Sequence, residues 1–201
     1  MSNYLSRELI KVFEELVMLV MSDDPVHGYP HVLRVRDLAL WIASKYEGVD
    51  VESLEIAALL HDIARSNSIK SSDHALKSAK VAELLLKAMG YSEDRIKLVV
   101  EAIATHSYSG GREPKSLEAK ILSDADKLDA LGAIGVARVL MYSAYVSRGL
   151  EGSIEHFRSK ILKLPNLMKT SVGKEEALRR VKYVIEFIEE LEKELSMFRS
   201  R

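Results

Sequence analysis

A histidine and an aspartate stand side by side within an apolar run, Leu54-Glu55-Ile56-Ala57-Ala58-Leu59-Leu60-His61-Asp62-Ile63-Ala64. Eight of these eleven residues are apolar, which predicts a largely buried helix. A buried carboxylate costs roughly several kcal/mol unless a partner compensates its charge. A divalent cation is the strongest such partner, because it takes an imidazole nitrogen and a carboxylate oxygen together. An arginine partner or a helix cap is the alternative, and the dipeptide alone does not decide between them.

Composition restricts the classes of function. The chain has 201 residues, 47% of them apolar, which suits one domain with a sizeable core. A net charge of −1 argues against binding of a nucleic-acid polymer. The absence of cysteine excludes disulfides, thiolate metal sites and cysteine nucleophiles. Any metal must therefore be held by His, Asp and Glu, which suits Mn, Mg, Fe, Co, Ni or Zn.

The sequence offers no candidate for a membrane span. The longest apolar stretch near the N-terminus runs only from Leu16 to Met21, far short of the bilayer thickness, and no basic segment precedes it as in a signal peptide. We therefore expect a cytoplasmic protein without a membrane partner.

Helical periodicity dominates the chain, and strand alternation is absent, which predicts an all-α fold. A first apolar stripe lies near the N-terminus, and Gly, Pro and polar residues separate the helices that follow. The helix that carries His61-Asp62 is expected to end near Ser66. The other helices are expected over about 30–46, 73–89, 92–106, 117–131, 134–147, 153–164 and 174–198. We expect a single domain over 1–201, with a metal-binding core at about 20–150 and accessory helices at about 151–201.

Further His and Asp residues fall on apolar helix faces. His31 shares a face with Val35, Leu38 and Ile42, and so is expected to point into the core. A core histidine bonded to a backbone carbonyl is the alternative. Asp126 and Asp129 lie about 60° apart on one helix, and Leu122, four residues before Asp126, makes that face partly apolar. A solvated acidic face is the alternative.

Three more histidines lie at helix ends or in a loop. His106 ends its helix on the apolar side, where an imidazolium would also gain from the helix dipole. His74 stands at a helix start, where the neutral imidazole of a metal ligand is favoured over the cation. His27 is in a loop four residues before His31. Because several helices or helix edges each direct a His or Asp toward one interior, coincidence becomes less plausible as the set grows.

The order His31, His61-Asp62, Asp126 resembles the H…HD…D signature of the HD-domain superfamily of metal-dependent phosphohydrolases. The flanks agree: Leu59 to Arg65 resembles the family's LLHDIGK/R helix, and Asp124 to Gly132 resembles the DADRLDALG segment of a small bacterial and archaeal subgroup. His156 to Leu164 resembles the tail of that subgroup. The resemblance covers about residues 20 to 195 and implies an HD-domain helical bundle with a C-terminal accessory helical section.

The resemblance also implies roles for individual residues. His31, His61, Asp62 and Asp126 match the four metal ligands of the family. His74 and His106 occupy the order in which binuclear members place two further histidines, so with His27 they are candidates for a second metal or a phosphate pocket. The sequence after His106 departs from the binuclear pattern, which leaves the number of metal ions open.

The chemistry of such a site predicts hydrolysis of a phosphate ester by metal-activated water, through a phosphomonoesterase or phosphodiesterase reaction. Asp62 is the candidate proton acceptor, Arg65 the candidate phosphate ligand, and Asp129 a candidate for orienting a metal ligand. For Arg65, a surface salt bridge is the alternative. The expected substrate is a small phosphorylated metabolite, and a nucleotide is the substrate that we expect first.

Two other functions fit the same residues. One is a nucleotide-binding sensor with little turnover, and the other is an HD-fold diiron oxygenase that uses His74 and His106. Specificity is expected to lie in loops at about 27–29 and 107–112, which carry no readable code. The apolar side of the last helix, from Val181 to Leu195, can pack on the body or on a second subunit, so a homo-oligomer stays open.

Overall fold

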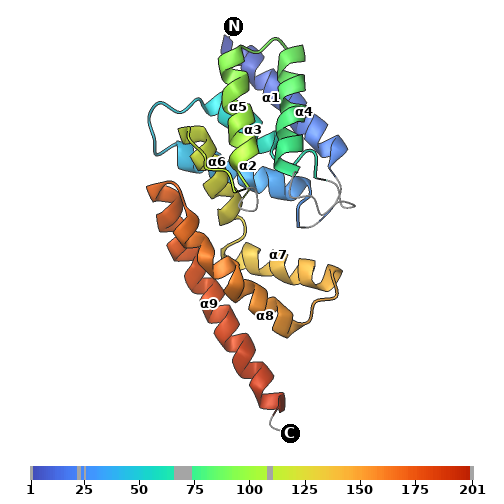
Figure 1. The fold of residues 1–201 in the computed structure, drawn as a ribbon, viewed down its shortest axis with the longest axis vertical. Coiled ribbons are helices and arrows are strands. Elements are labelled where there is room, and N and C mark those ends of the chain that lie inside the picture. Colours follow the sequence, from blue (N-terminus) through green and yellow to red (C-terminus); the bar gives the residue numbers. More distant parts are fainter. Residues whose placement is uncertain (1, 22–23, 25, 66–73, 108–110, 200–201) are drawn as a thin grey trace. The chain divides into compact units, whose positions relative to one another are not determined.

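The computed structural model describes residues 2–21, 24, 26–65, 74–107 and 111–199. Within these ranges every regular element is a helix (Figure 1), which confirms the all-α prediction. The elements are α1 (Ser2–Val20), α2 (Tyr29–Ala43), α3 (Val51–Leu60), α4 (His74–Ala88), α5 (Glu93–Thr105), α6 (Leu117–Leu128), α7 (Gly132–Tyr145), α8 (Leu150–Ser159), the 3-10 helix η2 (Ile161–Leu167) and α9 (Ser171–Arg199). No helix in the described ranges is long and apolar enough to cross a bilayer.

Helix α3 is the centre of the N-terminal part of the fold. It begins at an N-cap, Asp50, whose side chain accepts a hydrogen bond from the Ser53 backbone N–H at 3.0 Å. Leu54 and the whole segment 56–60 are fully shielded from solvent, and α3 contacts α1, α2, α4 and α5. A helix that is apolar on nearly all sides is stable only when other helices surround it, so α3 organises its neighbours.

The structure corrects the end of this helix. We expected it to continue to about Ser66, but α3 ends at Leu60, and residues 61–64 form turns. The tighter hydrogen bonds Ile63 N–H to Leu60 O and Arg65 N–H to Asp62 O replace the α-helical pattern there. His61 and Asp62 therefore lie where the chain leaves the buried helix rather than within it.

Other expected boundaries are close to those observed. Helix α2 ends at Ala43, three residues before the expected end, and α6 ends at Leu128 rather than near Leu131. Pro165 was expected to end a helix over 153–164, but α8 ends at Ser159 and Pro165 lies inside η2. The expected helix start at Asp73 and the polar loop before it lie outside the described residues.

The chain divides into two compact units, residues 1–126 and residues 127–201. In the second unit α7 and η2 pack on α9, and α8 packs on α7 and η2. The Phe157 and Phe187 rings meet edge to face, with centroids 6.2 Å apart. The arrangement as one domain with a core at about 20–150 stays a prediction.

Gly135 provides a test of packing in the second unit. A Cβ atom at this position of α7 would lie 2.2 Å from the backbone oxygen of Ala130. Because a backbone atom cannot move aside as a side chain can, Gly135→Ala should lower the free energy of unfolding by roughly 1–3 kcal/mol in chemical denaturation. Gly149→Ala is the matched control, since its Cβ would meet only the Glu151 carboxylate at 3.7 Å. Equal stabilities of the two variants would contradict this packing.

Candidate metal centre

Two histidines at helix ends are each held by a hydrogen bond from the ring to a backbone oxygen of the preceding turn. His61 is the C-cap of α3, and its Nδ1 lies 2.7 Å from the backbone oxygen of Ala58. His106 is the C-cap of α5, with Nδ1 2.6 Å from the oxygen of Ile103. Because a carbonyl oxygen can only accept, each Nδ1 must carry the proton, and a neutral ring then presents the Nε2 lone pair to the interior. This is the tautomer that an Nε2 metal ligand requires.

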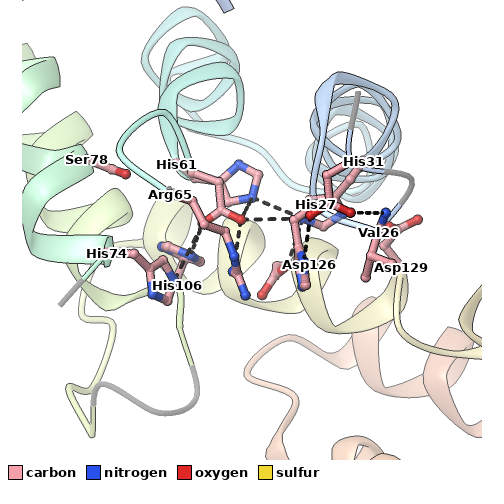
Figure 2. A network of polar contacts seen from close by, with 12 residues as sticks. Val26, His27, His31, His61, Arg65, His74, Ser78, His106, Asp126 and Asp129 are labelled. Carbon is pink, nitrogen blue, oxygen red and sulfur yellow. Dashed lines mark hydrogen bonds and ion pairs between the residues drawn. The ribbon is translucent and has the colours of Figure 1, made fainter. Parts of the chain in front are cut away.

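Five imidazole rings form a row across the first unit, as Figure 2 shows for His74, His106, His61, His31 and His27. Successive rings meet edge to face. The ring centroids are 5.5 Å apart for His74 and His106, 5.0 Å for His106 and His61, 5.3 Å for His61 and His31, and 6.1 Å for His31 and His27. The row joins the beginnings of α2 and α4 to the ends of α3 and α5.

The Asp62 carboxylate lies at the middle of this row and is 1% exposed. Its Oδ2 is 3.8 Å from His61 Nε2, 3.9 Å from His31 Nε2 and 3.1 Å from Arg65 Nη1. Its Oδ1 is 3.5 Å from His74 Nε2 and 3.7 Å from His106 Nε2, and this buried oxygen accepts no hydrogen bond from the residues that the structure describes. A buried oxygen that lacks a hydrogen bond is an available ligand for a cation.

The electrostatics favour an uncharged His61 and ionised aspartates, but they act in the other direction on His106. Burial acts to lower the pKa of His106, yet the neighbouring Asp62 carboxylate raises it above its ordinary value. Burial lowers the pKa of His61 to about 4, with His106 and His31 acting in the same direction. Burial acts to raise the pKa of Asp62, but His61, His106 and Arg65 hold it well below its ordinary value. Asp126 behaves similarly, since the histidines around it overcome the effect of burial and lower its pKa. At neutral pH His61 is therefore an uncharged ligand, and both aspartates are carboxylates.

Among the described residues, two sets of three have the geometry of a cation site. One atom each of His31, His61 and Asp62 lie within 4.8 Å of one another, and so do atoms of Asp62, His74 and His106. Asp126 from the last turn of α6 adds Oδ1 at 3.5 Å from His31 Nε2, while His31 and His61 Nε2 are 3.3 Å apart. Neighbouring ligands about 2.1 Å from one ion stand roughly 3.0–3.4 Å apart, so these residues fit a divalent ion with small adjustments of the carboxylates.

Asp24 and Ser78 also make contacts beside the cluster, and neither residue was predicted from the sequence. His27 Nδ1 lies 3.5 Å from Asp24 Oδ2, and Asp24 Oδ1 accepts a hydrogen bond from the Val26 backbone N–H. Ser78 Oγ on α4 accepts a hydrogen bond from the Ala64 N–H, which holds the turn after Asp62. The spacing of three between Asp24 and His27 was a signal for the first contact, whereas no local pattern indicates the second.

Two other candidate residues have well-defined partners. Arg65 keeps a side chain that is 34% exposed while it pairs with Asp62, so part of its guanidinium faces solvent. Asp129 belongs to the second unit and is fully buried. There its Oδ2 lies 2.8 Å from Arg138 Nη1, which also donates to the Asp129 backbone oxygen at 3.1 Å. Orientation of a metal ligand by Asp129 stays a prediction. Part of the expected loop over 107–112, residues 108–110, lies outside the described chain.

These residues fall within a recognised family region. The HD domain family matches residues 28–131, which contain His31, His61, Asp62, His74, His106 and Asp126. The chain belongs to the HD domain family. It is 33% identical to the YpgQ protein of Bacillus subtilis over 188 residues, which cover 89% of this chain and 90% of YpgQ.

Solved structures agree with this membership. The crystal structure of Bacillus subtilis YpgQ in complex with ADP matches with a TM-score of 0.77 and 30% identity, over 94% of this chain and 96% of that one. An HD-superfamily hydrolase from Bacillus thuringiensis matches with a TM-score of 0.74 and 32% identity, over 95% and 98% of the two chains. The protein thus has the fold of HD-superfamily hydrolases and a His/Asp cluster able to hold a divalent metal ion.

The lowered pKa of His61 predicts how stability depends on pH. In the unfolded chain the His61 side chain takes up a proton near pH 6.5, whereas in the folded protein it stays neutral down to about pH 4. Between these values the unfolded state binds more protons, so stability falls as the pH is lowered. In metal-free protein, lowering the pH from 7.5 to 5 should therefore reduce the free energy of unfolding of the wild type more than that of His61→Gln. Denaturant titrations at several pH values measure it, and a difference independent of pH would contradict the burial of a neutral His61.

Proposed function

We propose that this protein is a metal-dependent phosphohydrolase that cleaves a phosphate ester of a small metabolite, a nucleotide. The observation that carries the proposal is the convergence of His31, His61 and Asp62 around one point, with Asp126 beside His31, inside the region that matches the HD domain family. The ADP complex of YpgQ, a relative at 30% identity with the same fold, supports a nucleotide as the ligand class.

In this proposal His31, His61, Asp62 and Asp126 hold the ion. When bound, the divalent ion supplies Lewis acidity toward a phosphoryl oxygen and a water of lowered pKa. These four residues would supply two imidazoles and two carboxylates, which would leave room on a divalent ion for a water and a phosphoryl oxygen. The Nδ1 hydrogen bond of His61 to Ala58 keeps its Nε2 lone pair directed at the site throughout the reaction.

Asp62 and Arg65 act on the substrate and its nucleophile. Asp62 Oδ1, which accepts no hydrogen bond within the described part of the chain, is the acceptor for the proton of the attacking water. Arg65 is held at Asp62 by one nitrogen, and its remaining N–H groups are available to phosphate oxygens. His74 and His106 lie on the opposite side of Asp62 from His31, where they bind either a second ion or the phosphate group.

A nucleotide sensor is the second candidate, and the same ADP complex favours it, because a bound nucleotide does not require turnover. A diiron oxygenase draws support only from the second set of ligands, Asp62, His74 and His106. The candidates differ in measurable outputs, namely phosphate release, nucleotide affinity without hydrolysis, and oxygen uptake by the iron-loaded protein.

A substrate panel on metal-stripped protein tests the proposal. The protein is reconstituted separately with Mn, Mg, Co, Ni, Zn and Fe and assayed with phosphomonoesters, phosphodiesters and nucleoside mono-, di- and triphosphates. Asp126→Ala should abolish metal binding and turnover together, because it removes a charged ligand of the ion. Asp94→Ala, which changes an aspartate whose side chain is 98% exposed, is the matched control. Full activity with stoichiometric metal in Asp126→Ala would refute the ligand assignment.

His106 separates the two sides of the cluster. His106→Ala should lower kcat for the best substrate while one metal ion per chain is retained, since His106 is proposed to serve a second ion or the phosphate rather than the first ion. Metal content by elemental analysis and steady-state kinetics measure the two effects. Loss of all metal from this variant would move His106 into the primary ligand set.

A further inference from the structure

Helix α2 brings His31 to the cluster from its first turn, which has no side-chain cap. The N-cap residue is Gly28, which has no side chain that could accept a hydrogen bond from the first turn, and the His31 N–H donates to the Gly28 backbone oxygen at 2.9 Å. Pro30 sets the backbone for helix formation but donates no hydrogen bond. The first turn of a helix frays unless its groups are held, so another contact must keep His31 in place.

That contact comes from α1. Glu14 Oε1 accepts a hydrogen bond from the Tyr29 hydroxyl at 3.0 Å, and Glu14 Oε2 accepts one from Arg36 Nη1 at 2.9 Å. One carboxylate thus holds two residues of α2 with its two oxygens. Tyr29 is the first residue of α2, two positions before His31, and the helix also packs against α3.

The spacing of these residues determines what Glu14 controls. Tyr29 and Arg36 are seven residues apart, so they lie on nearly the same line along α2, whereas His31 points about 140–160° away from that line. Two anchors on one side of a helix resist rotation about its axis. Rotation of α2 would swing His31 Nε2 away from His61 Nε2 and Asp126 Oδ1, which lie at 3.3 and 3.5 Å.

The surroundings of Glu14 extend the constraint to α3. Glu55 lies on α3, which ends at Leu60 just before His61; its carboxylate is attracted by Arg36 and repelled by Glu14. Arg36 is 19% exposed and also pairs with Asp37 at 3.1 Å, so one guanidinium serves α1 and α2. Glu14 precedes the region 28–131 that matches the HD domain family, so the family region does not contain this anchor.

We propose that Glu14 is a positioning residue of the metal centre: by holding Tyr29 and Arg36 it fixes the rotation of α2 and so the place of His31. This inference rests on the proposed role of His31 as a metal ligand. The contribution of Glu14 is to metal affinity and to the symmetry of the ligand field, without contact to the ion.

Metal binding by the full chain tests the proposal. Co²⁺ is titrated into metal-stripped protein, its Kd is measured by calorimetry, and the visible absorption spectrum of the bound ion reports the ligand arrangement. Glu14→Ala should raise the Kd about tenfold and change the spectrum, at the lower end of the range seen when residues that orient metal ligands are removed. Tyr29→Phe, which deletes one oxygen and keeps the ring, should shift both in the same direction by a smaller amount.

The controls separate positioning from folding. Glu15→Ala changes the exposed neighbour on α1 and should bind Co²⁺ as the wild type does. Because the two residues share one hydrogen bond, Glu14→Ala combined with Tyr29→Phe should be no weaker in metal affinity than Glu14→Ala alone. Thermal unfolding of each metal-free variant shows that it is folded, and Tyr29→Phe carries the test if Glu14→Ala does not fold.

Two results overturn different parts of the account. A wild type that binds Co²⁺, with Glu14→Ala and Tyr29→Phe equal to it in Kd and in spectrum, overturns the positioning role and leaves the metal centre in place. A wild type that binds none of the tested ions overturns the proposed function on which the inference depends.

Discussion

The Asp62 carboxylate is the constraint around which the first unit is built. It is 1% exposed and follows a helix whose residues 56–60 are fully buried, and among the described residues one of its oxygens has no hydrogen-bond donor. An isolated charge in such a place would destabilise the fold, so partners must compensate it. Four histidines and Arg65 from α2, α3, α4 and α5 or the turns beside them lie within 4 Å of its oxygens. Arg65 supplies a permanent positive charge, and the histidine nitrogens join the carboxylate as a set of ligands able to hold a divalent ion.

Much of this arrangement could be predicted from local sequence. The apolar run before His61 indicates burial, and the 3.6-residue periodicity of the chain indicates helices, because both depend on neighbours in sequence. His31 and His106 were identified because a polar residue on an apolar face is costly without a partner, and His74 because a helix start favours a neutral imidazole. The structure places all three within 4 Å of an Asp62 oxygen. The comparison with known proteins then makes the family certain without giving the substrate.

The parts that could not be predicted depend on distant partners or on competition between local hydrogen bonds. The sequence does not indicate that Arg138 pairs with Asp129 or that Ser78 holds the turn at Ala64, since each pair comes from different elements. The end of α3 was misplaced because leucine and alanine continue a helix readily, whereas the His61 ring bonds to Ala58 and the backbone tightens after Leu60. Boundaries of this kind are decided by side-chain geometry that propensity does not contain.

The use of main-chain oxygens by His61 and His106 has a consequence for how this protein tolerates change. Ala58 and Ile103 each orient an imidazole through an atom that every amino acid possesses. Exchange of either side chain for another of suitable volume leaves that orientation intact, so these two positions are free to drift without a compensating mutation. If a carboxylate side chain oriented each histidine instead, that second residue could not be replaced without loss of the orientation.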